Sequence, residues 1–196
     1  MRRAIALALC LFAAPALAAD AQDGIKHSSS GGIGSQPATI PEILDAVGDC
    51  VAAVHQHGKV DFDKLKAAGW QFAGKQAGNV AAGVASIPTT QLYFGKDNVI
   101  QLIQMTGVSA SCQTIAMVTD GIGSEAAVRS GLTARFGAVS ASDYKGDEAF
   151  KASVERLAPG SLAHSMINDT NRFAVLGITK NGKSIVNVTM TPKITD

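Results

Sequence analysis

The sequence predicts an α+β fold, in which about four helices pack with an antiparallel sheet of about five strands. Three observations support this prediction. Apolar residues recur at helical spacing around Ile43 and again around Val128. Several short stretches between and after them are rich in β-branched residues, and an Asn-Gly pair joins the last two. The expected order is two helices, three strands, two helices and two strands, without an internal repeat.

The first helix is expected to begin after Thr39. Thr39 and Glu42 have the spacing of a capping box, and Pro41 suits a first helical turn, where no backbone N–H is needed. The helix is expected to end at Gly58. Its apolar face is formed by residues at helical spacing: Ile43, Val47, Cys50, Val51 and Val54.

A second, shorter helix is expected from Asp61 to Ala68, and Trp70 after it is expected to lie in the core. A connection rich in glycine and alanine, Gly74 to Ala85, leads from this region to the sheet. Three strands follow, separated by short turns, and they are expected to form an antiparallel meander: Thr90 to Phe94, Val99 to Met105 and Ser111 to Thr119.

Helical spacing returns after Ser124, the expected N-cap, and continues to Gly137, which is expected to stop this helix. Another helix is expected from about Asp147 to Ala158. The last two strands, Arg172 to Thr179 and Ser184 to Thr191, flank an Asn-Gly turn and therefore predict a β-hairpin.

This hairpin also matches the pattern of a phosphate-binding P-loop, from Gly177 to Ser184. A P-loop needs a helix after the glycine-rich turn, so that backbone N–H groups converge on the phosphates. The residues after Ser184 have strand composition instead. Nucleotide binding is therefore not expected, and the glycine and lysine are assigned to the hairpin turn.

The first eighteen residues have the features of a secretory signal peptide. Arg2 and Arg3 precede an apolar stretch from Ala4 to Ala14, and a small-x-small pattern follows at Ala16 to Ala18. We expect cleavage near Ala18 and a location in the periplasm or outside the cell. Residues 19–38 are polar and rich in serine and glycine, which predicts a flexible leader. Residues 39–196 are expected to form a single α+β domain.

The expected mature chain contains two cysteines, Cys50 and Cys112. In an oxidising compartment a pair of cysteines is most simply a disulfide. Such a bond would close a loop of about 60 residues and stabilise the fold by about 4 kcal/mol in the chain-entropy model. The alternative is a pair of separately buried thiols.

Composition and charge exclude several classes of function. Two of the 17 basic residues lie in the expected signal peptide, which leaves 15 basic and 16 acidic residues, a net charge of −1. No basic patch indicates nucleic acid binding, and no segment indicates stable membrane insertion. No cofactor is expected. His55 and His57 point to different sides of a helix, so no metal site is expected either.

The first functional hypothesis is a binding or interaction module without an evident catalytic site. An inhibitor, an immunity protein and a chaperone-like protein of the envelope are examples, each with an envelope or secreted protein as its partner. Surface strands and the segment 159–171, expected to be a loop, would supply the contacts. The candidate contact residues are Ser161, His164, Ser165 and Asp169.

Two alternatives remain open at the level of sequence. A small-ligand carrier would enclose an apolar pocket lined by Trp70 and the meander strands. A hydrolase would use the segment 161–169, with serine, His164 and Asp169 side chains converging in space. No catalytic motif supports an enzyme, and the sequence favours the interaction module by a small margin.

Overall fold

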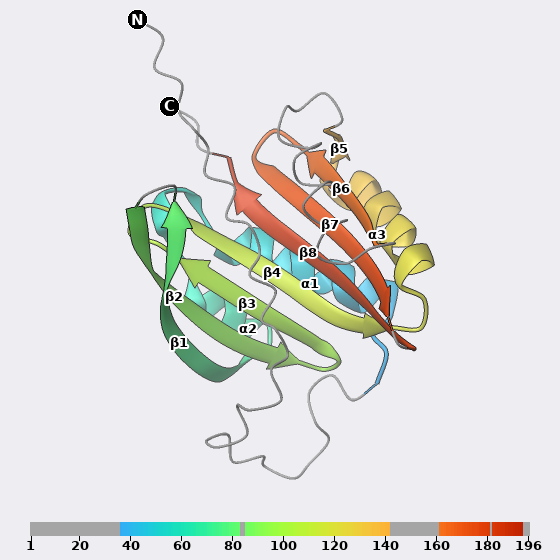
Figure 1. Ribbon diagram of the computed structural model, residues 1–196, viewed down its shortest axis with the longest axis horizontal. Helices are drawn as coiled ribbons and strands as arrows, with labels where there is room; N and C mark the ends of the chain where they lie inside the picture. Colours follow the sequence, from blue (N-terminus) through green and yellow to red (C-terminus); the bar gives the residue numbers. More distant parts are fainter. Residues whose placement is uncertain (1–35, 83–84, 142–160, 181, 194–196) are drawn as a thin grey trace, which may run out of the picture.

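The computed structural model describes residues 36–82, 85–141, 161–180 and 182–193. The expected signal peptide, most of the expected leader and the helix expected from Asp147 to Ala158 lie outside these ranges. In the described ranges the chain forms one eight-stranded antiparallel sheet and three α-helices (Figure 1). None of the described helices is long and apolar enough to span a bilayer.

The predicted α+β class is confirmed, and the number of elements is corrected. The sheet has eight strands rather than about five, and the described residues contain three α-helices rather than four. The helices are α1 (Ile40–Ala53), α2 (Phe62–Ala67) and α3 (Gly121–Phe136), with a short 3-10 helix η1 (Gln56–Gly58). The strands are β1 (Gln71–Ala82), β2 (Ala85–Lys96), β3 (Val99–Met105), β4 (Ala110–Val118), β5 (Val139–Ser140), β6 (Leu162–Ile167), β7 (Asn171–Lys180) and β8 (Lys183–Pro192).

The start of α1 agrees with the prediction. The backbone N–H of Thr39 donates to the Glu42 carboxylate over 2.6 Å, and the backbone N–H of Glu42 donates to the Thr39 hydroxyl over 3.4 Å. These reciprocal bonds form a capping box. The helix ends at Ala53 and not at Gly58, because His57 and Gly58 both have positive φ angles, 60° and 72°, which no α-helix accommodates.

The strand order in the sheet is β1-β2-β3-β4-β8-β7-β6-β5. Strands β1 to β4 and strands β5 to β8 are therefore two sets of four neighbours, and the pair β4–β8 joins the two sets. The helices lie on one face of the sheet (Figure 1). Helix α1 packs over β4, β8 and β3, while α3 packs over β7, β8 and β6.

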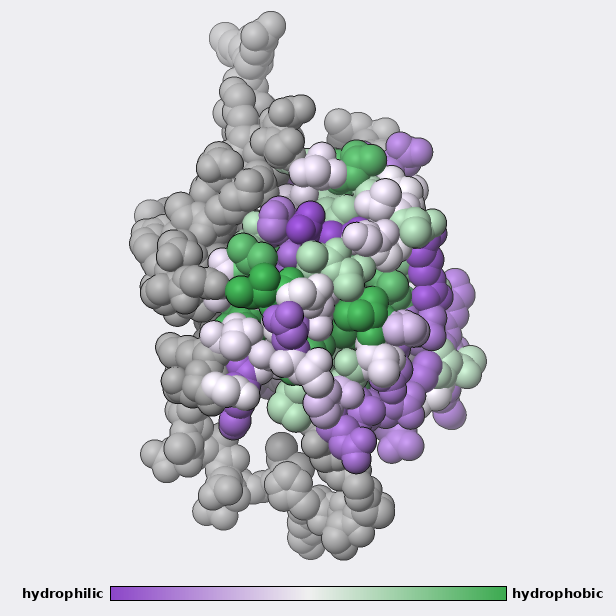
Figure 2. Space-filling view, turned by 90° about the vertical axis from the view of Figure 1, so that its right-hand side faces the viewer, coloured by the Kyte–Doolittle hydropathy of each residue, from purple (hydrophilic) through white to green (hydrophobic). Residues whose placement is uncertain are grey.

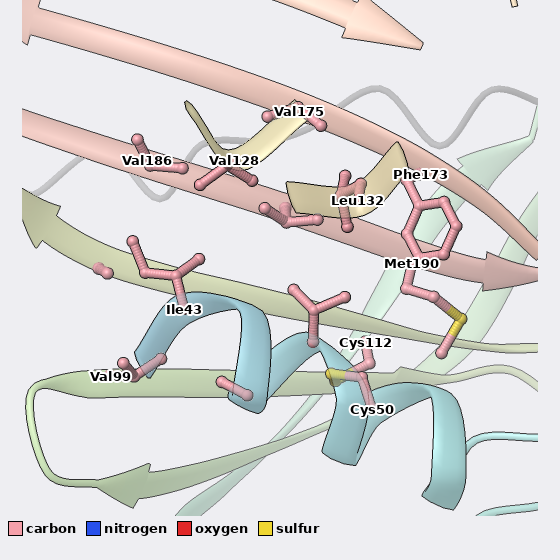
Figure 3. Close-up of a cluster of buried hydrophobic side chains, with 14 of the residues drawn as sticks. Ile43, Cys50, Val99, Cys112, Val128, Leu132, Phe173, Val175, Val186 and Met190 are labelled. Carbon is pink, nitrogen blue, oxygen red and sulfur yellow. A yellow bond between two sulfur atoms is a disulfide. The ribbon is translucent and has the colours of Figure 1, made fainter. Parts of the chain in front are cut away.

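The core lies between the two longer helices and the strands beneath them (Figure 3). Helix α1 buries Ile43, Val47 and Cys50, and α3 buries Val128 and Leu132. This is the helical spacing that the sequence indicates. The strands contribute alternate residues to the same core, as expected for a sheet with one helix-covered face. They include Val99, Ile103, Cys112, Phe173, Val175, Val186, Val188 and Met190.

The predicted disulfide is confirmed: Cys50 of α1 is bonded to Cys112 of β4. The Cα atoms are 5.9 Å apart, and both residues are fully buried. Helix α1 is therefore covalently fixed to a central strand of the sheet (Figure 3).

Strands β7 and β8 confirm the C-terminal hairpin, which pairs from Asn171 to Pro192. The residues that match the P-loop pattern are thus part of two paired strands and their turn. Helix α3 ends as predicted at Gly137, which has a φ of 64°, but its N-cap is Asp120 and not Ser124. The carboxylate of Asp120 accepts from the backbone N–H of Ile122 over 3.0 Å.

Two further segments differ from the prediction. The expected connection from Gly74 to Ala85 is most of strand β1, paired with an extended β2 over eleven residue pairs. The segment expected to be a loop after Pro159 contains β6, which pairs with β7. Strand β5, at the far edge of the sheet, has only two residues.

Candidate functional site

The candidate contact residues of the sequence analysis do not lie together in a loop. His164 and Ser165 are neighbours in β6, and Asp169 lies in the turn between β6 and β7. Successive side chains of a strand point to opposite faces of the sheet. The His164 imidazole therefore faces α3 on the helix side, while the Ser165 hydroxyl faces away from it. These two residues cannot form the nucleophile and base that the hydrolase hypothesis requires.

His164 contacts a buried carboxylate that the sequence analysis did not single out. Nδ1 of His164 lies 2.8 Å from Oε1 of Glu125, and Nε of Arg129 lies 2.8 Å from the same oxygen. Glu125 is fully buried beneath α3, whereas the side chains of His164 and Arg129 are about one third exposed, 33% and 34%. A buried carboxylate requires such partners, since desolvation otherwise opposes its charge. The cluster therefore holds α3 on β6.

Two glycines allow α3 to approach the sheet at this point. A Cβ atom on Gly177 of β7 would overlap the backbone oxygen of Gly121 and would lie 2.7 Å from the Cβ of Glu125. A Cβ on Gly121 would overlap the backbone oxygen of Ile178. Gly177, the first residue of the P-loop pattern, and Gly121 thus have a packing role: they bring the first turn of α3 against β7.

Trp70, the expected pocket residue, is almost completely buried between α1 and the end of β2. Its indole N–H donates to the Asp49 carboxylate over 2.9 Å. The Lys96 ammonium lies 5.8 Å from the centre of the ring and 3.3 Å from the same Asp49 carboxylate. Trp70 is therefore a satisfied core anchor, as the sequence indicates for this position.

Two hollows in the described part of the chain are not enclosed apolar pockets. One, of about 60 Å³, lies beside Trp70 and is bordered by four charged residues: Glu42, Asp45, Lys96 and Asp97. The other, of about 540 Å³, is open to solvent and lies around His55 and the start of α2. His55 and His57 are exposed, and the described residues contain no cluster of three metal-binding side chains.

Strand β1 has an outer edge that no described strand covers. It stands at the end of the sheet and pairs with β2 alone among the described strands, so its outer edge carries backbone N–H and C=O groups without a neighbouring strand there. It is twelve residues long, whereas β5 at the opposite edge has two. Natural proteins usually protect such edges with prolines, charges or very short strands. Lys75 and a bulge between Phe72 and Gly74 are the only such devices in β1.

The outer half of the β1–β2 hairpin extends beyond the rest of the sheet. Strand β2 pairs with β3 only from Thr90 to Lys96, so residues 85–89 pair with β1 alone. Pro88 lies in this part, opposite Asn79. A proline cannot donate to a ladder and is tolerated where a strand lacks a second neighbour. The green hairpin in Figure 1 projects from the sheet accordingly.

An exposed group of aromatic rings lies where β1 begins. Phe94 of β2 is buried, and its ring packs edge-on against Phe72 at 5.7 Å and stacked against Phe62 at 6.2 Å between ring centres. Phe72 is 61% exposed and Phe62 is 41% exposed. We call these three residues the aromatic cluster. Exposed rings beside a free strand edge are a feature of protein-binding surfaces.

Lys75 is the only charged residue of β1. Its side chain is exposed and makes no hydrogen bond or ion pair with any other described residue. Lys75 is paired with Leu92 and Phe72 with Phe94, two β2 residues that pack on the helix side of the sheet. Lys75 and Phe72 therefore project from the same side of β1.

No match to this chain was found among protein-family models, curated proteins or solved structures. The geometry of the chain is therefore the basis for its functional interpretation.

The side of the molecule that carries α3 also exposes some apolar residues. Figure 2 shows the side that carries α3, where apolar residues form small areas separated by polar ones. The exposed apolar residues there include Ile122 and Val139. The free edge of β1 and the aromatic cluster together form the candidate functional site.

Proposed function

We propose that this chain is an exported binding protein and that it receives an extended segment of another protein along the free edge of β1. The signal-peptide features of residues 1–18 support export to the periplasm or beyond. The single observation that carries the binding proposal is the twelve-residue edge strand, whose outer backbone groups pair with no other described strand. A segment that adds to such an edge gains main-chain hydrogen bonds along its whole length.

Inhibitors, immunity proteins and chaperone-like proteins of the envelope are the classes of protein for which this binding mode is useful. Each of them has to hold a segment of another protein without chemical change. The fully buried core, fixed by the Cys50–Cys112 bond, supplies a rigid support for the edge. Binding by a preorganised strand costs less conformational entropy than binding by a loop.

The test uses two neighbouring substitutions in β1, Gln76→Pro and Ala77→Pro. In an antiparallel strand, adjacent residues direct their backbone N–H groups to opposite sides. One substitution therefore removes a donor from the outer edge, and the other disrupts the ladder with β2. Thermal unfolding identifies the variant that keeps the stability of the parent chain, and this is the edge-blocked variant.

The chain and its edge-blocked variant are then purified gently from the envelope fraction and compared by native mass spectrometry. We expect a protein-sized adduct on the parent chain that the edge-blocked variant lacks. An adduct of a few hundred daltons that both forms retain would instead identify a small-ligand carrier and overturn the proposal.

A further inference from the structure

The side chains beside the β1 edge restrict which extended segments it can accept. Backbone hydrogen bonds hold any segment of suitable length, whereas selectivity comes from the side chains that flank the edge. On the helix side of β1 these are Phe72, Lys75, Ala77 and Asn79, of which Phe72 and Lys75 supply a ring and a charge. On the other side the first three after the bulge are Gly74, Gln76 and Gly78, two of which have no side chain. Selection therefore depends on the helix side.

Phe72 provides an apolar contact at one end of the edge. Its exposed ring already packs against Phe94, and Phe62 extends the apolar surface beyond Phe94. An apolar side chain on the incoming strand would lie directly beside Phe72, at the distance of neighbouring strands. Aromatic residues that become buried in this way account for much of the binding energy at protein interfaces.

Lys75 provides a positive charge on the same side. It has no carboxylate partner among the described residues, and neither β1 nor β2 contains an acidic residue. Opposite charges on neighbouring strands stabilise their pairing, while like charges oppose it. An acidic residue beside Lys75 is therefore favoured on the incoming strand.

The same charge argues against a second copy of this chain as the occupant. If two β1 edges paired, each would bring another Lys75 to the interface and no carboxylate. In the register that places the two Lys75 residues opposite each other, the ammonium groups would lie close together, and no register would give either lysine a carboxylate from the other β1. The occupant favoured by charge is therefore a segment of a different protein.

We infer that the segment bound by β1 carries an acidic residue beside Lys75 and an apolar residue beside Phe72, two positions apart. This inference rests on the proposed function, because it assumes that the β1 edge is the binding site. The spacing of two follows from the strand period, because the acidic and the apolar side chain of the segment must lie on the same face. Phe72 and Lys75 are three positions apart in β1, but the bulge between Phe72 and Gly74 contains one extra residue, so a neighbouring strand spans the same distance with two.

A symmetric peptide tests the inference whichever way the strand runs. The probe has the sequence Thr-Thr-Phe-Thr-Glu-Thr-Phe-Thr-Thr, in which an apolar residue lies two positions from the acid on each side. A charge-reversed control replaces its glutamate with lysine, and an anchor control replaces both phenylalanines with alanine. Each peptide carries a fluorophore, and its affinity for the full chain is measured by anisotropy.

We expect the acidic peptide to bind about three to ten times more tightly than the lysine peptide, in line with cross-strand charge pairs. Lys75→Glu should reverse this order of affinities, and Phe72→Ala should weaken the acidic peptide about tenfold or more. Lys183→Glu serves as the matched control, because β8 is separated from β1 by three strands. It should leave the order of affinities unchanged.

The outcomes separate this inference from the proposed function. One outcome is that the edge-blocked variant binds none of the peptides while Lys75→Glu changes no affinity. The β1 edge is then the binding site, but the inferred preference for an acidic residue beside Lys75 is wrong. If the edge-blocked variant binds every peptide as the parent does, both the edge proposal and the inference fail. Sedimentation of the chain without peptide gives the remaining outcome: a dimer that the edge-blocked variant lacks would identify a second copy as the occupant and overturn the inference.

Discussion

At the level of single residues, the buried carboxylate of Glu125 gives His164 a structural role. The imidazole and the Arg129 guanidinium both contact one oxygen of Glu125, while the other oxygen, Oε2, is buried without a hydrogen-bond partner among the described residues. Within the described part of the chain, these two side chains thus hold the carboxylate. Removal of either should leave a charge that is poorly compensated beneath α3.

We therefore predict that His164→Ala lowers the free energy of unfolding by about 2 kcal/mol, since it removes a hydrogen bond to a buried charge. Ser165→Ala, on the opposite face of the same strand, should change it by less than about 0.5 kcal/mol. Urea unfolding of the two variants measures both values. Equal effects would contradict the structural role of His164.

The protonation state of Glu42 makes the stability of the α1 cap depend on pH. The backbone N–H of Thr39, then its hydroxyl, and also the Asn98 amide hold the pKa of Glu42 below its ordinary value. A carboxyl whose pKa falls on folding stabilises the folded state above its ordinary pKa, and this contribution is lost as the pH falls through the folded-state pKa. Glu42 thus supports α1 at neutral pH and not in acid.

Glu42→Gln should consequently cost about 1 kcal/mol at pH 7, as for the loss of a helix cap, and less near pH 3. Thermal unfolding of the parent chain and of the variant across this pH range tests the prediction. Thr39→Ala, which removes one of the donors, should reduce the same pH dependence. An unchanged difference between the parent chain and Glu42→Gln at all pH values would contradict it.

At the level of elements, the contact between α3 and β7 depends on glycine. Gly177→Ala would place a methyl group against the backbone of Gly121, so α3 would have to shift away from the sheet. We predict a loss of about 2 kcal/mol or more, typical of overpacked sites. Gly107→Ala is the control, because no atom lies within 4 Å of its added Cβ. Chemical denaturation compares them, and equal stabilities would show that α3 adjusts without cost.

Helix α1 and strands β3, β4, β7 and β8 could be predicted from the sequence. Their apolar and β-branched residues follow the spacing of a helix or a strand within each segment. Strand β1 could not be predicted, since glycine, alanine, glutamine and asparagine have low strand propensity and its conformation depends on pairing with β2. Strand β6 contains His164 and Ser165, which resemble loop residues. The burial of Glu125 could not be predicted either. It depends on α3 lying beside β6, and one sequence does not show which elements are neighbours.

At the level of the whole molecule, the disulfide closes a loop between residues 62 positions apart. The double substitution Cys50→Ala with Cys112→Ala should lower the free energy of unfolding by about 4 kcal/mol, as the chain-entropy model gives for this length. Denaturant unfolding measures the change. Intact mass after alkylation, with and without reductant, is the control, and full alkylation without reductant would contradict the bond.

The sheet also sets the number of partners that one chain can hold. Each set of four strands follows a helix, and in each set the first strand, β1 or β5, is the outermost. The two edges are thus counterparts, yet β1 has twelve residues and β5 has two. Among the described strands only β1 offers an edge of this length, so the complex expected under the proposed function contains one chain and one segment. Such a protein would bind one partner at a time and would not cross-link two partner molecules.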